Sequence, residues 1–469
     1  MYKHTFDKTI LRSYDIRGIY GKTLTDEDAF MLGFFFGTTV RKKNPDKKHP
    51  LIIIGMDGRL SSPILEQKLN EGLEDSGCEI FRIGLGPTPM LYFASNYYEA
   101  DGAIQVTGSH NPKDYNGFKI VLNQASFFGE NIQRLGHFAI KGYSKTYNGF
   151  SKSVEINSKY IDEITKPLKI NDREFHKKTI VWDCGNGASG PSVEMITTKI
   201  PGKHIVLYSD VNGNFPNHHP DPTDESTLKI LSKKMVEVDA DLGIAFDGDG
   251  DRIGVIDKQG RSVAGDLLTA FLANSITTKD KNKQTIILDI KSSHIAYEKI
   301  ISLGFKAEIG KTGHSNIKKR IKEIKSPLAG EMSGHIFFGD TYFGYDDALY
   351  ASIRVLSLIA NNIELDKFVS SLPKTYVSPE IKVFCSDKIK FSTIENISKT
   401  VFKKYNFNDV ISLDGLRVKN SHGWWLIRAS NTEEALVVRF EGKSEKDKNE
   451  LFLEVKKLLK NEGLTLDNY

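Results

Sequence analysis

The sequence predicts an α/β protein with three similar α/β domains, whose sheets are mixed, and a smaller C-terminal α+β domain, all around a central cleft. Apolar, β-branched runs that end in Gly, Asp or Ser recur in three groups of three. Helix-like segments separate these runs, which is the pattern of βαβ units. After Pro373 the pattern changes to short alternating runs and a Lys-rich terminal segment, which indicates a smaller and different domain.

The elements follow in chain order. A helix is expected to begin after Thr25, because its hydroxyl can cap the first turn and the acidic residues there complement the helix dipole. The expected strands are residues 51–55, 80–84 and 102–106, then 179–182, 204–208 and 241–246, then 285–288, 305–309 and 328–329. In the last domain a strand is expected at 436–440 and a helix at 445–461. The expected domains are residues 1–155, 156–258, 259–372 and 373–469.

Composition excludes several classes of protein. The 64 Lys and Arg against 60 Asp and Glu leave a net charge of +4, which is too slight to indicate a nucleic-acid partner. Cys78, Cys184 and Cys385 are scattered without C-x-x-C spacing, so neither a disulfide framework nor a zinc site is indicated. The longest apolar stretch, residues 29–40, is far shorter than the ~20 residues of a membrane helix. We therefore expect a cytoplasmic protein with no membrane partner.

Three aspartates stand at every second position, Asp247, Asp249 and Asp251, with glycines between them and Arg252 after them. Alternate residues of an extended chain project to one side, so these carboxylates converge. A small set of oxygen ligands suits Mg²⁺, which keeps positions for phosphate oxygens, better than Ca²⁺. An EF-hand would need glycine where Arg252 stands and glutamate where Lys258 stands. The spacing predicts a magnesium site.

A strand is expected to run directly into Ser109, within the segment T-G-S-H-N-P at residues 107–112. The proline stops any immediate helix, so the serine is presented like a nucleophile. The alternative is an ordinary Ser/Thr turn with His110 on the surface. A serine hydrolase fits less well, because neither Ser109 nor Ser333 stands in a G-x-S-x-G elbow and acyl transfer needs no metal loop. A phosphoryl carrier explains both loops.

Glu331, Ser333 and His335 alternate in the segment at 330–335, so their side chains can face one ligand and match sugar hydroxyls. A polar turn is the alternative interpretation. Ligands of open α/β sheets lie beyond the carboxyl ends of the strands. The loops at 107–111, 247–252 and 330–335 each follow the third strand of a group, and we therefore expect them to share one cleft.

Arg428 opens a segment of small hydroxyl and amide residues at 428–432. A guanidinium beside such groups is suited to charge-assisted hydrogen bonds with a phosphate. An Asn/Ser turn between strands is the alternative.

A second glycine pattern points to another class of enzyme. Residues 185–190 form G-x-G-x-x-G after an expected strand, with Asp210 about twenty residues on, which is typical of a nicotinamide-dependent dehydrogenase. Such an enzyme gives no use for three clustered aspartates or for the serine loop, and Asn186 and Pro191 make the glycine turn atypical. Gly310-Lys311-Thr312 hints at a Walker loop, but Phe305 stands where its first glycine is required. A sugar-phosphate sensor without turnover is a third alternative.

With these motifs in order, the chain resembles the α-D-phosphohexomutase superfamily, specifically its bacterial phosphomannomutase/phosphoglucomutase branch. The resemblance spans the whole chain. It rests on Y-D-I-R-G at residues 14–18, T-G-S-H-N-P, D-G-D-G-D-R at 247–252, G-E-M-S-G-H at 330–335 and R-A-S-N-T-E at 428–433. The sequence departs from the family pattern at Glu434, where relatives often have proline. The resemblance therefore does not determine the backbone path of the loop at residues 428–433.

The resemblance implies an enzyme that moves a phosphate between the 1- and 6-hydroxyls of mannose or glucose through a phosphoserine. It implies Mg²⁺ as cofactor and hexose 1,6-bisphosphate as activator and intermediate. The catalytic residues would be Ser109, His110, Lys119 and His335, and the metal ligands Ser109, Asp247, Asp249 and Asp251. The substrate-binding residues would be Tyr14, Arg17, Asn111, Arg252, Lys291, His314, Glu331, Ser333, His335, Arg428, Ser430, Asn431 and Thr432.

By the same resemblance the four domains would carry the phosphoserine, the metal, the sugar and the phosphate sites in turn. One serine serves both ends of the sugar, so the bisphosphate must turn within the cleft, and a hinge is expected near Leu372 and Pro373. His335, His110 and Lys119 all stay open as the base. Met332 and Ala429 resemble the mannose/glucose branch, whereas glucosamine-phosphate mutases, the alternative, usually have glutamine and proline there. Small sugar phosphates are the expected partners of a monomer or weak homo-oligomer.

Overall fold

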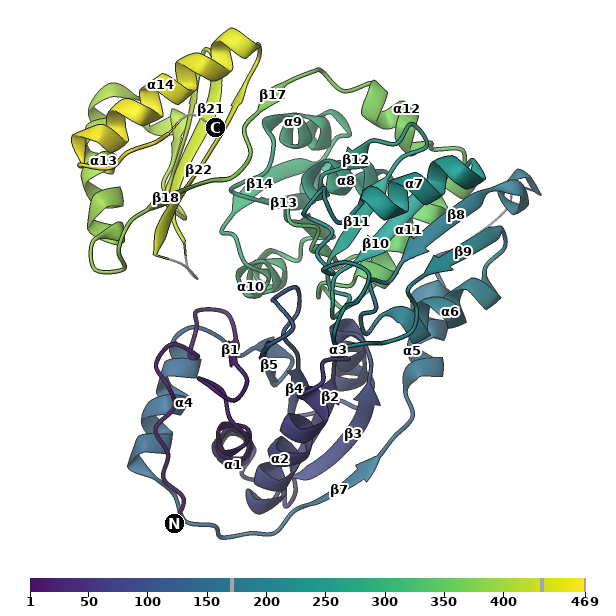
Figure 1. Cartoon of the computed structure of the whole chain (residues 1–469), viewed down its shortest axis with the longest axis vertical. Coiled ribbons are helices and arrows are strands. Elements are labelled where there is room, and N and C mark those ends of the chain that lie inside the picture. Colours follow the sequence, from purple (N-terminus) through teal and green to yellow (C-terminus); the bar gives the residue numbers. More distant parts are fainter. Residues whose placement is uncertain (169–172, 431–433, 468–469) are drawn as a thin grey trace.

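The computed structural model describes residues 1–168, 173–430 and 434–467, which form four sheets with their helices (Figure 1). The first three sheets combine parallel and antiparallel strands and are covered by helices, and the last is antiparallel. The predicted α/β class is therefore confirmed. In Figure 1 the first unit lies at the bottom, the next two at the right and the C-terminal unit at the upper left.

The strands have the following bounds and order within each sheet. The first sheet runs β1 (Ile16–Ile19), β5 (Tyr115–Leu122), β4 (Gly102–Val106), β2 (Leu51–Met56), β3 (Glu79–Leu85) and β7 (Phe150–Ser153), with β6 (Ala125–Ser126) on β5. The second runs β12 (Ser262–Val263), β11 (Ile253–Ile256), β10 (Leu242–Phe246), β8 (Thr179–Asp183) and β9 (Lys203–Leu207). The third runs β14 (Lys306–Gly310), β13 (Thr285–Asp289), β15 (Leu328–Gly330) and β16 (Ile336–Phe338). The last runs β17 (Tyr376–Val377), β22 (Ala435–Gly442), β21 (Gly423–Ala429), β20 (Leu416–Asn420) and β19 (Val410–Ile411), with β18 (Ile381–Phe384) on β22.

The α-helices are α1 (Asp26–Lys43), α2 (Ser62–Asp75), α3 (Thr88–Tyr97), α4 (Glu130–Lys141), α5 (Asn157–Thr165), α6 (Gly190–Lys199), α7 (Lys229–Val238), α8 (Gly265–Leu272), α9 (His294–Ser302), α10 (His314–Ile324), α11 (Ala348–Ala360), α12 (Leu365–Ser370), α13 (Lys390–Lys404) and α14 (Glu445–Asn461). Thr25 caps α1 as expected, since its hydroxyl accepts from the backbone N–H of Asp28 at 3.3 Å and Asp28 reaches back to the Thr25 N–H at 2.8 Å. No helix in the described part of the chain combines the length and the apolar character that crossing a membrane requires.

The three α/β sheets share one plan. In each, the third strand of the expected group pairs in parallel with the first strand on one side. On its other side it pairs with an antiparallel strand that the sequence analysis did not find, namely β5, β11 or β16. Each polar loop is therefore the turn of a hairpin, between β4 and β5, β10 and β11, or β15 and β16. The nine expected strands are all present, with ends that differ by a residue or two.

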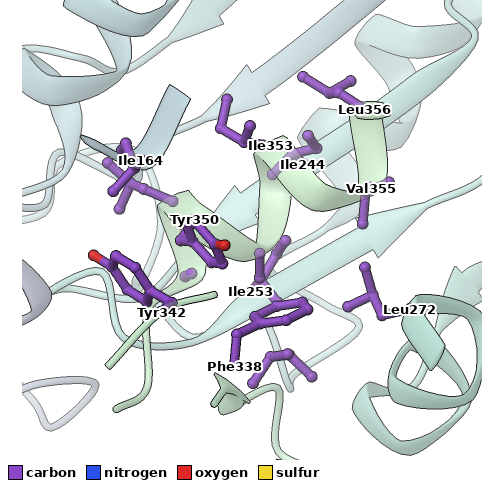
Figure 2. Packing of buried hydrophobic residues seen from close by; sticks show 14 of the residues in the cluster. Ile164, Ile244, Ile253, Leu272, Phe338, Tyr342, Tyr350, Ile353, Val355 and Leu356 are labelled. Atoms are coloured by element: carbon purple, nitrogen blue, oxygen red, sulfur yellow. The ribbon is translucent and has the colours of Figure 1, made fainter. Parts of the chain in front are cut away.

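One hydrophobic core joins the first three units. The helix α11 contributes Ile353, Val355 and Leu356 to it, and these side chains lie close to Ile244 of β10 and Ile253 of β11 (Figure 2). The C-terminal unit has a separate core between its sheet and the helices α13 and α14. The chain enters that unit between α12 and β17, where Leu372 and Pro373 lie. The expected hinge there stays a prediction, as do the expected domain boundaries.

Glycines allow α1 and α2 to pack backbone to backbone. A Cβ at Gly72 would lie 1.9 Å from the carbonyl oxygen of Phe30. Helix propensity alone would make alanine more favourable than glycine here by about 1 kcal/mol. We predict the opposite sign for Gly72→Ala, a net loss of about 1–2 kcal/mol of unfolding free energy in urea, because overpacking forces the helices apart.

The matched control is Glu71→Ala on the same helix, where no tight packing is disturbed, and it should change the unfolding free energy by less than about 0.5 kcal/mol. A Gly72→Ala protein more stable than the original chain would contradict this account of the helix contact.

Candidate functional site

The three hairpin loops meet at one place. Ser109 Oγ, from the first loop, donates to Asp247 Oδ2 of the second at 2.9 Å. Lys119 Nζ, on β5, donates to Asp249 Oδ2 at 2.6 Å and also to Asp251. Arg252 Nε, from the second loop, donates to His335 Nε2 of the third at 3.1 Å. The expectation that these loops share one cleft is thus met by direct contacts between them.

A cavity of about 1010 Å³ opens over these loops. Its walls come from all four units and include twelve of the residues expected from the sequence, namely Tyr14, Arg17, His110, Asn111, Arg252, Lys291, His314, Glu331, Ser333, His335, Arg428 and Ser430. Ser109, Lys119 and the three aspartates are buried and do not line the cavity themselves, but Ser109 contacts His110 and Asp247 contacts Arg252, which do. Asn431 and Thr432 lie outside the described residues. The cavity is large enough for a phosphorylated sugar.

Ser109 is held in an unusual backbone conformation, with φ +49°, in the left-handed region that larger residues rarely adopt. Its N–H donates to Thr107 Oγ1 at 2.8 Å, and its Oγ lies 3.1 Å from His110 Nδ1. Burial holds the pKa of His110 well below its usual range, and the cations Arg252 and Arg17 act in the same direction. His110 is therefore neutral at neutral pH and can accept a proton from a neighbouring hydroxyl.

The acidic triplet carries more negative charge than the protein neutralises. Asp247, Asp249 and Asp251 are fully buried, and Lys119 is the cation in direct contact with two of them. Burial and the two neighbouring aspartates raise the pKa of Asp247 well above its usual range. Burial also opposes the charged form of Asp249, but Lys119 outweighs it and lowers the pKa of Asp249.

This arrangement fits a divalent cation. Ligand oxygens of all three aspartates lie within 4.8 Å of one another. Among the described residues, Asp249 Oδ1 and Asp251 Oδ1 are buried without any hydrogen-bond donor. Unpaired buried carboxylate oxygens cost free energy unless a cation meets them. A hard cation that prefers a few oxygen ligands, such as Mg²⁺, would bind these carboxylate oxygens and remove that cost.

The G-x-G-x-x-G segment supports the aspartate loop. The N–H of Ala188 donates to the carbonyl oxygen of Gly248 at 2.9 Å, and a Cβ at Gly187 would lie 2.9 Å from the same oxygen. The aspartate loop thus occupies the space over the glycines where a dinucleotide pyrophosphate would have to lie. The dehydrogenase alternative has no support from this geometry.

The third loop presents a carboxylate and two imidazoles to the cavity. Glu331 Oε1 accepts from the Gly313 N–H at 2.5 Å, and burial raises the pKa of Glu331. His335 stacks on His314 with ring centroids 5.6 Å apart, and its Nδ1 lies 3.1 Å from Asp346 Oδ2. Because Arg252 donates to the other ring nitrogen, His335 is fixed in orientation on both sides.

The C-terminal unit supplies cations to the far side of the cavity. Arg428, at the end of β21, is buried and its Nη2 lies 3.1 Å from Asp414 Oδ2. Burial favours the neutral form of Arg428, but Asp414 outweighs it and raises its pKa. Lys390 Nζ donates to the carbonyl oxygen of Ser430 at 2.6 Å, directly after β21.

Several residues of the site were missed by the sequence analysis. Arg439 lines the cavity and donates to the carbonyl oxygen of Lys291 at 2.7 Å, and Glu380 lies 3.1 Å from Lys291 Nζ. Both belong to ordinary alternating segments, so no local pattern marks them. Lys318, which pairs with Asp346 at 2.9 Å, does carry a signal, because it follows His314 by four residues on one helix face.

Comparisons with known proteins identify relatives along nearly the whole chain. Models of the phosphoglucomutase/phosphomannomutase family match the chain with their alpha/beta/alpha domains I, II and III over residues 8–135, 158–260 and 264–376, and with their C-terminal domain over 380–458. The chain is 38% identical over 450 residues to the phosphomannomutase/phosphoglucomutase of Pseudomonas aeruginosa, which covers 94% of each. It is 36% identical over 439 residues to the phosphoglucomutase of Neisseria gonorrhoeae, covering 92% of this chain and 93% of that one.

A solved structure agrees as well. The crystal structure of a phosphoglucomutase/phosphomannomutase family protein from Burkholderia thailandensis superposes with a TM-score of 0.90 at 33% identity, covering 98% of this chain and all of that one. Together with the family models, which follow one another along nearly the whole chain, these matches establish that the chain belongs to the phosphoglucomutase/phosphomannomutase family.

Proposed function

We propose that the protein is a phosphohexomutase, an isomerase that interconverts the 1-phosphate and the 6-phosphate of mannose or glucose. The observation that carries the proposal is the contact of Ser109 Oγ with Asp247 at 2.9 Å, directly beside His110 in the wall of a cavity that Arg428 and Arg252 also line. Relatives named phosphomannomutase/phosphoglucomutase support the choice of sugars.

In the first step phosphorylated Ser109 gives its phosphoryl group to the free hydroxyl of a bound hexose monophosphate. The bond from Oγ to phosphorus breaks, a new bond from the sugar oxygen to phosphorus forms, and the hydroxyl proton leaves to a base. The product is hexose 1,6-bisphosphate. After the bisphosphate turns in the cavity, its other phosphate returns to Ser109, which leaves the isomeric monophosphate.

Positioning and charge neutralisation are the main requirements of such transfers. Asp247, Asp249 and Asp251, with an oxygen of Ser109 or its phosphate, would hold Mg²⁺, which when bound neutralises charge on the moving group. Lys119 stays charged because the aspartates around it outweigh the effect of burial and raise its pKa. Its contacts with Asp249 and Asp251 suit it to neutralising charge near the moving group, and Lys119, His110 and His335 are the three candidate proton acceptors.

Residues on the cavity wall would bind the parts of the substrate that do not react. Arg428 and Ser430, with Asn431 and Thr432, would hold the distal phosphate, and Glu331 and Ser333 the sugar hydroxyls. Tyr14, Arg17, Asn111, Lys291 and His314 line the same space and would complete the site. Accordingly, residues 1–155 would be the phosphoserine domain, 156–258 the metal domain, 259–372 the sugar domain and 373–469 the phosphate domain. Glucosamine phosphates are the alternative substrates, and a comparison of turnover on the three sugars decides between them.

Ser109→Ala should lose at least about 1000-fold in kcat, because it removes the covalent carrier, while hexose phosphate still binds. Coupled-assay turnover and calorimetric binding check the two parts. Ser302→Ala, on an exposed turn of α9, is the control and should keep full activity. Retained turnover in Ser109→Ala would refute the phosphoserine.

Arg428→Ala should raise KM for hexose monophosphates by about 10- to 100-fold, since charge-assisted hydrogen bonds to a charged group contribute about 1.5–3 kcal/mol each. Its effect on kcat should be smaller. Steady-state kinetics on the folded variant measures both constants, and an unchanged KM would place the distal phosphate elsewhere.

Removal of divalent metal with a chelator should abolish turnover, and Mg²⁺ should restore it. Added Mg²⁺ should also raise the melting temperature of the original chain but not that of Asp249→Asn, because binding to the folded state alone stabilises it. Equal stabilisation of both proteins would mean that the metal binds at another place.

A further inference from the structure

Arg59 is a buried cation that no step of the proposed mechanism uses. It belongs to the turn after β2, its side chain is 1% exposed, and it does not line the cavity. Burial lowers the pKa of its guanidinium, which Asp57 at 3.3 Å from Nε partly offsets. A charge so deeply buried is costly unless its donors are used.

The two terminal nitrogens of Arg59 donate to the backbone of the Ser109 loop. Nη1 donates to the carbonyl oxygens of Pro112 at 2.6 Å and Tyr115 at 2.9 Å. Nη2 donates to those of Ser109 at 2.7 Å and Asn111 at 2.6 Å. One planar group thus holds four carbonyls of the turn between β4 and β5, and this turn carries Ser109 next to His110 of the cavity wall.

Asp57 holds the other end of the same turn. Its Oδ2 accepts from the N–H of Gly108 at 3.0 Å, and its Oδ1 accepts from Ser62 Oγ at 2.5 Å at the start of α2. Gly108 lies directly on the guanidinium, because a Cβ there would be 2.4 Å from Arg59 Nε. The turn is therefore clamped between a carboxylate and a guanidinium that are both anchored in the first sheet.

The clamp is closed by a segment of the second unit. The ring of Phe215 lies 5.4 Å from Arg59 Cζ, and a Cβ at Gly213 would be 2.7 Å from the carbonyl oxygen of Gly58. Arg59 thus lies where the unit that carries Ser109 meets the unit that carries the aspartates.

We infer that Arg59, held by Asp57, is a positioning residue that keeps the Ser109 turn in its left-handed conformation, so that Oγ faces Asp247 for phosphoryl transfer. The inference rests on the proposed function for its kinetic part. The Ser109 conformation, at φ +49°, is one that a free turn leaves readily. Since Arg59 does not line the cavity, its loss should affect transfer and spare binding.

Arg59→Lys tests this, because lysine keeps the charge but cannot reproduce the planar fork that reaches four carbonyls. We expect kcat to fall by about 100-fold, as for a reacting group displaced by about 1 Å, while KM changes by less than about 3-fold. In Arg59→Lys, glucose 1,6-bisphosphate should also phosphorylate Ser109 more slowly, by a similar factor. Intact-protein mass spectrometry over time measures this rate.

Arg354→Lys is the matched control. Arg354 is also buried, 4% exposed, and donates to Asp340 and Ser275 away from the cavity. It should lose stability but keep kcat per folded molecule. A folded Arg59→Lys protein with unchanged kcat and phosphorylation rate would overturn the inference, and so would equal kinetic losses in both variants.

Hydrogen exchange at residues 108–111 gives a readout that needs no turnover. Exchange there should be faster in Arg59→Lys than in the original chain, and unchanged in Arg354→Lys. If the original chain shows no mutase activity, the proposed function fails. The clamp is then judged by hydrogen exchange alone: faster exchange at residues 108–111 in Arg59→Lys supports it, and unchanged exchange overturns it. If Arg59→Lys does not fold, Asp57→Asn replaces it: a lower kcat with retained KM supports the clamp, and unchanged kinetics overturns it.

Discussion

The site depends on a charge imbalance that no single unit of the protein could hold alone. Three carboxylates of one hairpin turn are fully buried, and the cation that meets two of them, Lys119, belongs to a neighbouring unit. Removing the Lys119 side chain would leave these buried carboxylates without that cation, which is strongly destabilising. Ser109 Oγ also contacts Asp247 across this interface. The contacts that stabilise the interface therefore also fix the position of the Ser109 hydroxyl.

Repetition of one sheet plan explains how the remaining groups arrive at the cavity. In each of the first three units a buried parallel strand turns back through a hairpin, and the turn lies at the carboxyl edge of the sheet, where ligands bind. The shared core around α11 fixes these units relative to one another (Figure 2). The C-terminal unit has its own core and meets the third unit through a small cluster of Ile290, Trp424 and Leu426.

Much of the fold and the centre of the site could be predicted from the sequence, because their signals are local. The strands of the three groups are β-branched runs with abrupt polar ends, and the aspartates and Ser109 lie within single segments. The antiparallel strands β11 and β16 are too short, at four and three residues, for any periodicity to show. Arg59 contacts Ser109, which is 50 positions further along the chain. Asp346 contacts His335, which belongs to another segment. Only the folded chain brings each pair together. The role of the glycines at 185–190 could not be predicted for the same reason, since only the structure shows Gly248 packed over them.

The central claim is that one serine passes a phosphate to and from both ends of the sugar. A chase experiment tests it most directly: the enzyme is labelled with radioactive phosphate, isolated, and mixed with unlabelled hexose 6-phosphate. The account predicts that the label starts on the peptide that contains Ser109, moves to hexose 1,6-bisphosphate, and then appears in hexose monophosphate. Label on another residue, or label released only as inorganic phosphate, would contradict it.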